Sequence, residues 1–426
     1  MTTSPNRSAG TLDPSFGLGG KAFPTNPQDP NGFAWGLTID PADKVLIAGR
    51  FGWNYAITRL ESDGEPDASF GQKGIATGKF QEGFKSQASG ITLLTDNKIL
   101  LTGVFTETEG EQDIPALARF DEYGRLDTSF GEQGTVVVRV PLKGCAPITR
   151  TSSLEGRPSN HDNGGTSVLQ DGKILLSSNH SYSFTEFVGV LIRLLPDGAL
   201  DTSFNEGEGF TTVRHPDYPT TITAKLIQSD QKIIVAGTAF TEAGTVALVA
   251  RYHVNGKLDT SFGNAGFFLS TATGEQCQIS GLALQSKGMI VAAGSTLSFP
   301  RQCMLWSLTA SGTFNPLFNS GKPLITSIDE NPGGSEWIAV TVQPDSKIVV
   351  QGNTLGGEEA DVVLRRYSAT GKPDLDFGDE TGLVRTKVGD SIDMGMAVGL
   401  DTCERIVVAG MYFTAGFRPF VLRYLS

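Results

Sequence analysis

A nine-residue motif recurs along the chain and constrains its fold more than any other feature. Three copies read LDPSFGLGG, LDTSFGEQG and LDTSFGNAG, at residues 12–20, 126–134 and 258–266. The phenylalanine of the motif occurs seven times, at intervals of 54 to 60 residues with one longer step of 74. Its positions are Phe16, Phe70, Phe130, Phe204, Phe262, Phe318 and Phe377. Regular repetition at this length predicts a solenoid, a propeller or a similar array.

A second landmark follows the phenylalanine after about 28 residues in most units, and it combines a turn, a cation and a run of β-branched residues. Examples are DPADKVLIAG, LTDNKILLTG and QSDQKIIVAG. Asp with Gly, Asn or Ser between two apolar runs is typical of a hairpin. Each unit is therefore expected to hold four short strands. In the second unit we place them at 90–95, 98–105, 116–120 and 135–140.

Seven units of four antiparallel strands, without helical periodicity, predict an all-β chain that forms a seven-bladed β-propeller. A single-sheet array is the weaker alternative. A lone unit buries only one face, so stacking around a closed ring supplies the core. We expect one propeller domain over residues 1–426, with the blade repeats ending near residues 79, 140, 214, 270, 327 and 387.

The two ends of the chain are expected to complete one blade together. The last unit, 391–426, stops after a third strand, whereas the chain begins with the motif and a fourth strand at 11–23. Ring closure would then bring Arg423 to Asp13, which are separated by almost the whole sequence.

An arginine stands eleven residues before the phenylalanine and an aspartate three residues before it, so we expect an ion pair in each unit. The pairs are Arg59–Asp67, Arg119–Asp127, Arg193–Asp201, Arg251–Asp259, Arg366–Asp374 and, across the closure, Arg423–Asp13. One unit carries Ser307 and Asn315 instead. The joint loss indicates that the two side chains interact, because a buried charge without its partner is costly.

These motifs resemble the Delta-60 repeat family of bacterial proteins, whose signature is a strand, PDGK, a strand and LDxSFGxxG. The resemblance covers essentially the whole chain. It departs from the signature in FNPLFNSG and at Asp376 of PDLDFGDETG. The resemblance implies a propeller-like β fold and brings no general enzymatic activity, cofactor or catalytic residue with it.

Composition narrows the classes of partner and compartment. A net charge of -12 and a pI near 4.9 argue against nucleic acid and against an anionic membrane face as ligands. The chain shows neither a secretory signal nor a membrane span, so a cytoplasmic location is the default expectation and leaderless secretion stays open. The cysteines lie far apart, without metal-ligand spacing, so we expect free thiols, no metal and no cofactor. Cys277 and Cys303 form the one pair to compare in the structure.

Ligand contacts are expected on the face of the disc where the connections differ between units. Aromatic side chains beside these connections suit sugars, whose C–H faces stack on rings. The candidates are Trp35, Trp53, Tyr182 and Trp337, together with Arg150, His161 and Asp162 of the long crossover at 141–165. The acidic loops lack calcium-loop spacing, and no catalytic motif is present, so no catalytic residue is predicted.

The first functional prediction is a non-catalytic binding propeller that recognises a glycan or a protein through the variable loops. The alternative is an enzyme, a hydrolase or lyase with an acidic site in the central funnel, and a passive scaffold is the third possibility. Two facing carboxyl groups with a displaced pKa would favour the enzyme. The sequence leaves the oligomeric state open.

Overall fold

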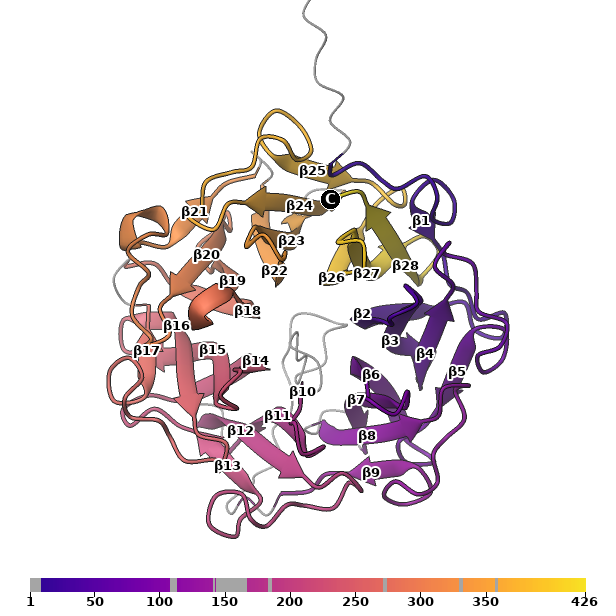
Figure 1. The fold of residues 1–426 in the computed structure, drawn as a ribbon, viewed down its shortest axis with the longest axis horizontal. Coiled ribbons are helices and arrows are strands. Elements are labelled where there is room, and N and C mark those ends of the chain that lie inside the picture. Colours follow the sequence, from indigo (N-terminus) through magenta and orange to yellow (C-terminus); the bar gives the residue numbers. More distant parts are fainter. Residues whose placement is uncertain are drawn as a thin grey trace, which may run out of the picture.

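The chain folds into seven four-stranded sheets arranged as blades around a central axis (Figure 1). A computed structural model describes residues 9–107, 113–140, 142, 167–182, 186–270, 274–328, 332–356 and 359–426. Neighbouring strands in every sheet are antiparallel, and the strands of a blade follow one another from the axis to the rim. The predicted all-β, seven-bladed propeller is therefore confirmed.

The inner strands line the centre of the ring in Figure 1. They are β2 (Gly32–Ile39), β6 (Lys85–Leu93), β10 (Ser167–Val168), β14 (Thr220–Ile227), β18 (Cys277–Leu284), β22 (Gly334–Val342) and β26 (Asp393–Leu400). The second strands are β3 (Val45–Phe51), β7 (Ile99–Thr106), β11 (Ile174–Ser181), β15 (Ile233–Thr241), β19 (Ile290–Thr296), β23 (Ile348–Leu355) and β27 (Ile406–Phe413).

The third strands are β4 (Asn54–Leu60), β8 (Ile114–Phe120), β12 (Phe187–Leu194), β16 (Gly244–Tyr252), β20 (Cys303–Leu308), β24 (Val362–Tyr367) and β28 (Phe417–Tyr424). The outer strands are β1 (Lys21–Ala22), β5 (Ile75–Gly78), β9 (Thr135–Val137), β13 (Phe210–Val213), β17 (Phe267–Leu269), β21 (Leu324–Thr326) and β25 (Leu383–Thr386). Two short 3-10 turns lie at Ser286–Gly288 and Asn319–Gly321. We number the blades 1 to 7 from β2, so that β26, β27, β28 and β1 form blade 7.

The hydrophobic core lies between consecutive blades. In β7, seven successive residues from Ile99 are buried, because both faces of this strand are covered by neighbouring sheets. This double burial explains why the second strands read as unbroken aliphatic runs instead of alternating patterns. One cluster joins Leu46 and Tyr55 of blade 1 to Leu101 and Phe105 of blade 2. The core is thus built by stacking, as the repeat predicts.

Each inner strand other than the short β10 contains a β-bulge at the same place. The bulged residues are Trp35, Ser89, Thr223, Ser280, Ile338 and Met396. A bulge shifts the two-residue alternation of side chains by one position. This shift accounts for a wrong boundary in the prediction: the inner strand of blade 2 was placed at 90–95, whereas β6 begins at Lys85.

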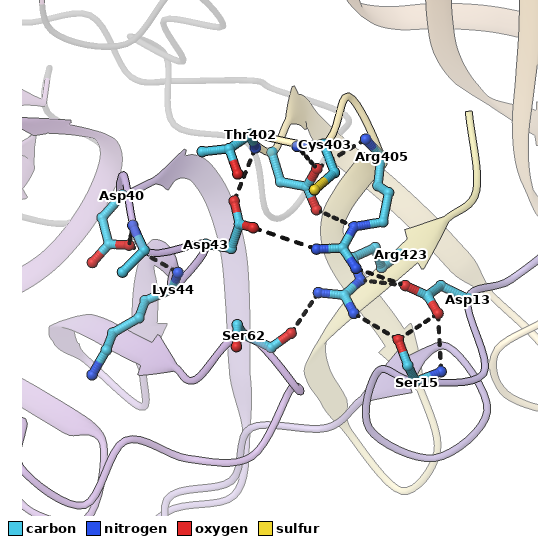
Figure 2. Close-up of polar contacts among 12 residues, drawn as sticks. Asp13, Ser15, Asp40, Asp43, Lys44, Ser62, Thr402, Cys403, Arg405 and Arg423 are labelled. Carbon is cyan, nitrogen blue, oxygen red and sulfur yellow. Dashed lines mark hydrogen bonds and ion pairs between the residues drawn. The ribbon is translucent and has the colours of Figure 1, made fainter.

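The ring closes through blade 7, where β1 from the start of the chain pairs with β28 from its end, Lys21 opposite Leu422. Arg423 Nε donates to Asp13 Oδ2 over 2.9 Å, and Arg405 Nη1 donates to the same oxygen over 3.3 Å (Figure 2). Ser15 completes the set of donors around Asp13, with its hydroxyl 2.6 Å from Oδ1. The predicted closure by the N-terminal strand is confirmed.

All six Arg–Asp pairs are present, with Nε to Oδ2 distances of 2.7 to 2.9 Å. The structure adds a third member that sequence reasoning missed. The cation of the turn between the first two strands reaches the same aspartate, at 2.8 to 3.4 Å, from Lys44, Lys98, Lys173, Lys232, Lys347 and Arg405. In blade 5 Asn315 donates to Ser307 over 3.1 Å, and Met289 occupies the lysine position. All three charges are therefore lost together there.

The repeated motif ties each blade to the next. Phe130 is fully buried, and the guanidinium of Arg119 stacks on its ring at 4.5 Å. The same guanidinium donates to Pro196 O of blade 3 over 2.7 Å. Gly131 has a positive φ of 53°, and a Cβ there would lie 2.2 Å from Thr135 O, so a larger residue at this position would be strained. The role of the motif is structural.

Candidate functional site

The two faces of the disc differ in how their connections vary between blades. The turns between first and second strands and between third and fourth strands carry the repeated motifs and share one face. The other face carries the loops between second and third strands and the crossovers between blades. We call it the variable face.

Two acidic residues come together on the variable face at the junction of blades 6 and 7. Asp361 directly precedes β24, and Asp393 is the first residue of β26. Ala360 and Ile392, the residues before them, form a parallel β-bridge, and the Asp393 N–H donates to Ala360 O over 2.7 Å. Two carboxyl groups 32 residues apart in sequence are thereby held next to each other.

Asp393 secures the crossover between the two blades. Its carboxylate is fully buried and accepts hydrogen bonds from the N–H groups of Val388 and Gly389 over 2.6 and 2.9 Å. Ser86 and Thr220, at the equivalent position of blades 2 and 4, bond the crossover backbone through hydroxyl groups. Burial raises the pKa of Asp393 by more than the two hydrogen bonds lower it. The first position of the inner strand therefore has a structural role. Among the described inner strands, only β26 carries an acidic residue there.

Asp361 is an incompletely bonded acid. The residue is 8% exposed, and its buried Oδ1 has no hydrogen-bond partner among the described residues. Its Oδ2 lies 3.6 Å from Nε of Arg385. Burial raises the pKa of Asp361, and the negative charges of Asp393 and Glu359 raise it further. Asp361 therefore holds its proton at a higher pH than an ordinary aspartate.

Glu359 lies on the solvent side of the same site. Its side chain is 55% exposed, and Oε1 accepts from the Lys387 ammonium over 2.9 Å. Two carboxyl groups two residues apart thus occupy different environments, one buried and one in water. Such a difference is how proteins assign the roles of acid and base to neighbouring carboxyl groups.

A line of aromatic side chains leads from this acidic site to blade 1. Phe413 donates its N–H to Ile392 O over 2.8 Å, and its ring lies 5.2 Å from that of Phe417. Phe417 in turn lies 5.2 Å from Phe33. The guanidinium of Arg50 is 4.5 Å from the Phe33 ring and 4.3 Å from the ring of Trp53, which is 52% exposed. We call Phe413, Phe417, Phe33 and Trp53 the aromatic track.

The aromatic residues proposed from the sequence lie in three different parts of the structure. Trp35 and Trp53 come together at blade 1, where Trp35 is buried and stacks on Phe33 at 5.0 Å. Trp337 is fully buried in the core that blades 5 and 6 share. Tyr182, on blade 3, packs edge-on against His180 at 4.7 Å.

The charged candidates Arg150, His161 and Asp162 lie outside the described residues. Sequence reasoning missed Arg50 and Asp393, and it considered Asp361 only as part of the acidic loop 355–361. Comparison of the repeats could have marked two of them, since Arg50 is the only cation at its position in the second strands and Asp393 the only acid at its position in the described inner strands.

The described residues also contain buried cysteines and a cleft beside blade 2. Within these parts of the chain no group of three or more His, Cys, Asp or Glu side chains is arranged to hold a metal ion. Cys277 and Cys303 are both buried free thiols. A cleft of about 1150 Å³ beside β9 is lined by Lys79, Glu82, Glu132, Arg139 and Asp197 among others. None of the helical turns in the described segments is long and apolar enough to cross a membrane.

Comparison with known proteins supports a propeller built from a known repeat. Residues 42–70, 94–130, 169–204 and 228–262 match the family described as "Domain of unknown function (DUF5122) beta-propeller". The matches fall on blades 1 to 4 and contain the turn cation and the motif. No curated protein matches the sequence.

Solved structures with a similar fold include polysaccharide lyase Uly1, with a TM-score of 0.51 and 10% identity over 100% of this chain and 96% of that one. A polysaccharide lyase of family PL25, an ulvan lyase bound to -[GlcA(1-4)Rha3S]-, has a TM-score of 0.47 and 11% identity over 98% and 94%. The GH74 xyloglucanase from Xanthomonas campestris has a TM-score of 0.47 and 14% identity over 89% and 52%. At 10% identity the likeness to Uly1 shows a shared fold alone.

These comparisons correct the first functional prediction. A non-catalytic binding propeller was expected, but the solved structure with a TM-score above 0.5 among these, polysaccharide lyase Uly1, is described as an enzyme. The prediction is therefore wrong, and the alternative of an enzyme agrees better with the findings. The sequence contains no catalytic motif that could have indicated this.

Proposed function

We propose that the protein is an enzyme that hydrolyses a glycosidic bond of a polysaccharide, with Asp361 as the proton donor. The observation that carries this proposal is the placement of Asp361 beside Asp393 on the variable face, where burial and, after it, the charge of Asp393 raise the pKa of Asp361. A carboxyl group with a raised pKa keeps its proton to a higher pH than an ordinary aspartate, as a general acid requires.

In the proposed step, the Asp361 carboxyl donates its proton to the glycosidic oxygen as the bond between that oxygen and the anomeric carbon breaks. The leaving sugar keeps the bonding electron pair and departs as an alcohol. Water adds to the anomeric carbon and gives its proton to Glu359, whose exposed carboxylate is positioned in solvent. Asp393 acts through Asp361 and is a positioning residue, since its buried carboxylate is held by backbone N–H groups.

The aromatic track supports a polymeric substrate. Its first ring belongs to Phe413, which is hydrogen-bonded to Ile392, the residue before Asp393, and its last rings lie on blade 1. A polysaccharide chain bound at Asp361 would therefore continue over Phe413, Phe417 and Phe33. Sugar rings stack on aromatic faces through their C–H groups, as expected for the glycan ligand predicted from the sequence. The similar fold of polysaccharide lyase Uly1 makes polysaccharides the first substrates to test.

The test compares Asp361→Asn with the wild type on a panel of neutral and acidic polysaccharides, with new reducing ends as the readout. Loss of a general acid should lower the rate by about 100-fold or more. Wild-type activity should fall as the pH rises through the pKa of Asp361, because the acid works only when protonated. Asp345→Asn is the matched control, since Asp345 is an exposed aspartate of the same blade on the opposite face.

Each outcome decides a part of the proposal. An Asp361→Asn protein that is folded and cleaves at the wild-type rate would remove Asp361 from the reaction. Products with unsaturated ends, detected by their ultraviolet absorbance, would show elimination and contradict the water step. Hydrolysis that needs Asp361 and tolerates Asp345→Asn supports the proposal.

A further inference from the structure

Arg50 on the second strand of blade 1 is a cation that packs against aromatic rings. Its guanidinium lies 4.5 Å from the ring of Phe33 and 4.3 Å from that of Trp53. Its Nε is buried and has no hydrogen-bond partner among the residues that the structure describes. Every described arginine of the repeated Arg–Asp pairs, in contrast, has a carboxylate within 2.9 Å. Arg50 thus keeps hydrogen-bonding capacity that the fold does not use.

The fold does not need an arginine at this position. The equivalent residues of the other second strands are uncharged: Val104, Asn179, Thr238, Ser295, Asn353 and Met411. Asn179 and Asn353 bond the backbone of the next inner strand, at Ile222 and Gly395. An uncharged side chain therefore serves the structural purpose, and Arg50 is a departure that stability does not explain.

The surroundings of Arg50 suit an anionic group. The Lys85 ammonium lies 4.2 Å from the centre of the Trp53 ring, so two cations flank one exposed indole on the variable face. Asp29 is the acid whose charge acts on Arg50, and its Oδ1 accepts from the Asn31 N–H over 3.1 Å. Burial lowers the pKa of Arg50 to about 10, and Asp29 opposes this shift, so the guanidinium stays charged at neutral pH.

We propose that Arg50, Lys85 and the face of Trp53 form a subsite for an anionic sugar, whose carboxylate or sulfate group pairs with the guanidinium. Guanidinium donates two parallel hydrogen bonds to such groups, and the pairing is strongest where water is excluded. The indole stacks on the ring of the same sugar. This inference rests on the proposed function, because the aromatic track joins the subsite to Asp361, and it narrows the substrate to an acidic polysaccharide.

The test measures binding by calorimetry in an Asp361→Asn background, so that no probe is cleaved. One pair of probes is an oligogalacturonate and its methyl ester, and the other is a chondroitin sulfate oligosaccharide and its desulfated form. We expect at least one acidic probe to bind about tenfold or more tightly than its partner without that charge. The pair that shows the preference identifies carboxylate or sulfate as the recognised group.

Variants then locate the preference. Arg50→Gln should weaken binding of the acidic probe by about tenfold or more and leave the neutral probe unchanged. Asp29→Asn should tighten binding of the acidic probe, because it removes the competing carboxylate. Arg125→Gln is the matched control, an arginine that stacks on Tyr123 at 5.3 Å on the opposite face. Unchanged melting temperatures show that the variants fold.

Equal binding of the acidic and neutral probes, or full binding by folded Arg50→Gln, would overturn the subsite. Failure of the proposed function shows itself separately, as undiminished cleavage by Asp361→Asn. Binding that depends on Arg50, in a protein whose cleavage does not depend on Asp361, would keep the subsite and reject the catalytic acid.

Discussion

Neutralising one charge cluster in the repeat tests whether its members stabilise the fold as a unit. In blade 4, Asp259 accepts from Arg251 over 2.8 Å and lies 3.4 Å from the Lys232 ammonium. Asp259 and Arg251 are 3% and 7% exposed. Asp259→Asn leaves a buried guanidinium without its carboxylate, which costs about 3–5 kcal/mol. An unfolding entropy of about 2.1 cal/mol/K per residue gives ~0.9 kcal/mol/K for 426 residues, so the melting temperature should fall by about 3–6 °C.

Blade 5 supplies the neutral reference, because it carries Ser307, Asn315 and Met289 at the three positions. The triple variant Arg251→Ser, Asp259→Asn, Lys232→Met copies this set into blade 4. It should lose less stability than Asp259→Asn alone, since no buried charge is left without a partner. The assay is thermal and urea unfolding of the wild type, the single variants and the triple variant. A triple variant as unstable as the sum of the single changes would refute the cooperative unit.

Three further outcomes are expected. Deletion of residues 1–23 removes β1 and Asp13, so the ring should open or unfold, and cooperative melting at the wild-type temperature would contradict this closure. Burial alone would raise the pKa of Asp67, but hydrogen bonds from Lys44 and Ser69 and the charge of Arg59 outweigh it and lower this pKa. The resulting stability, present above the ordinary aspartate pKa of about 4, should be lost as the pH falls below it, a decline that melting at stepped pH would reveal. Because the pKa of Asp361 is raised, its ionised form opposes folding at neutral pH. Asp361→Asn should therefore raise the melting temperature at pH 7 relative to Asp345→Asn, and this gain should shrink in acid. A lower melting temperature of Asp361→Asn both at pH 7 and in acid would show that the Asp361 charge does not destabilise the fold.

The repeat made most of the architecture predictable. The interval between the motif phenylalanines gives the number of blades, and the missing fourth strand in 391–426 gives the closure by Asp13 and Arg423. The joint replacement of Arg and Asp by Ser307 and Asn315 in one unit indicates that these two positions form an ion pair in the other units. These inferences are possible because the chain contains seven copies of one unit. A residue that the fold requires recurs in the copies, and a copy that departs from the pattern can be recognised by comparison.

Strand boundaries were less predictable where the backbone departs from regular pairing. The bulge at Ser89 displaces the alternation in β6 and hid the first residues of that strand. The lysine of the charge cluster was visible only as part of a turn, because its partner Asp67 stands 23 residues after Lys44 in the next turn of the same face.

The sequence by itself determined the propeller, its number of blades, its closure and the structural purpose of the motif, because these follow from interactions repeated at fixed spacing. Only the tertiary structure decided the candidate site. The pKa of Asp361 depends on burial and on Asp393 of the next blade, and the aromatic contacts of Arg50 depend on Phe33 of the neighbouring strand and on Trp53 of the turn after β3. These properties arise between strands and between blades, where a single linear pattern carries no signal of what will be adjacent.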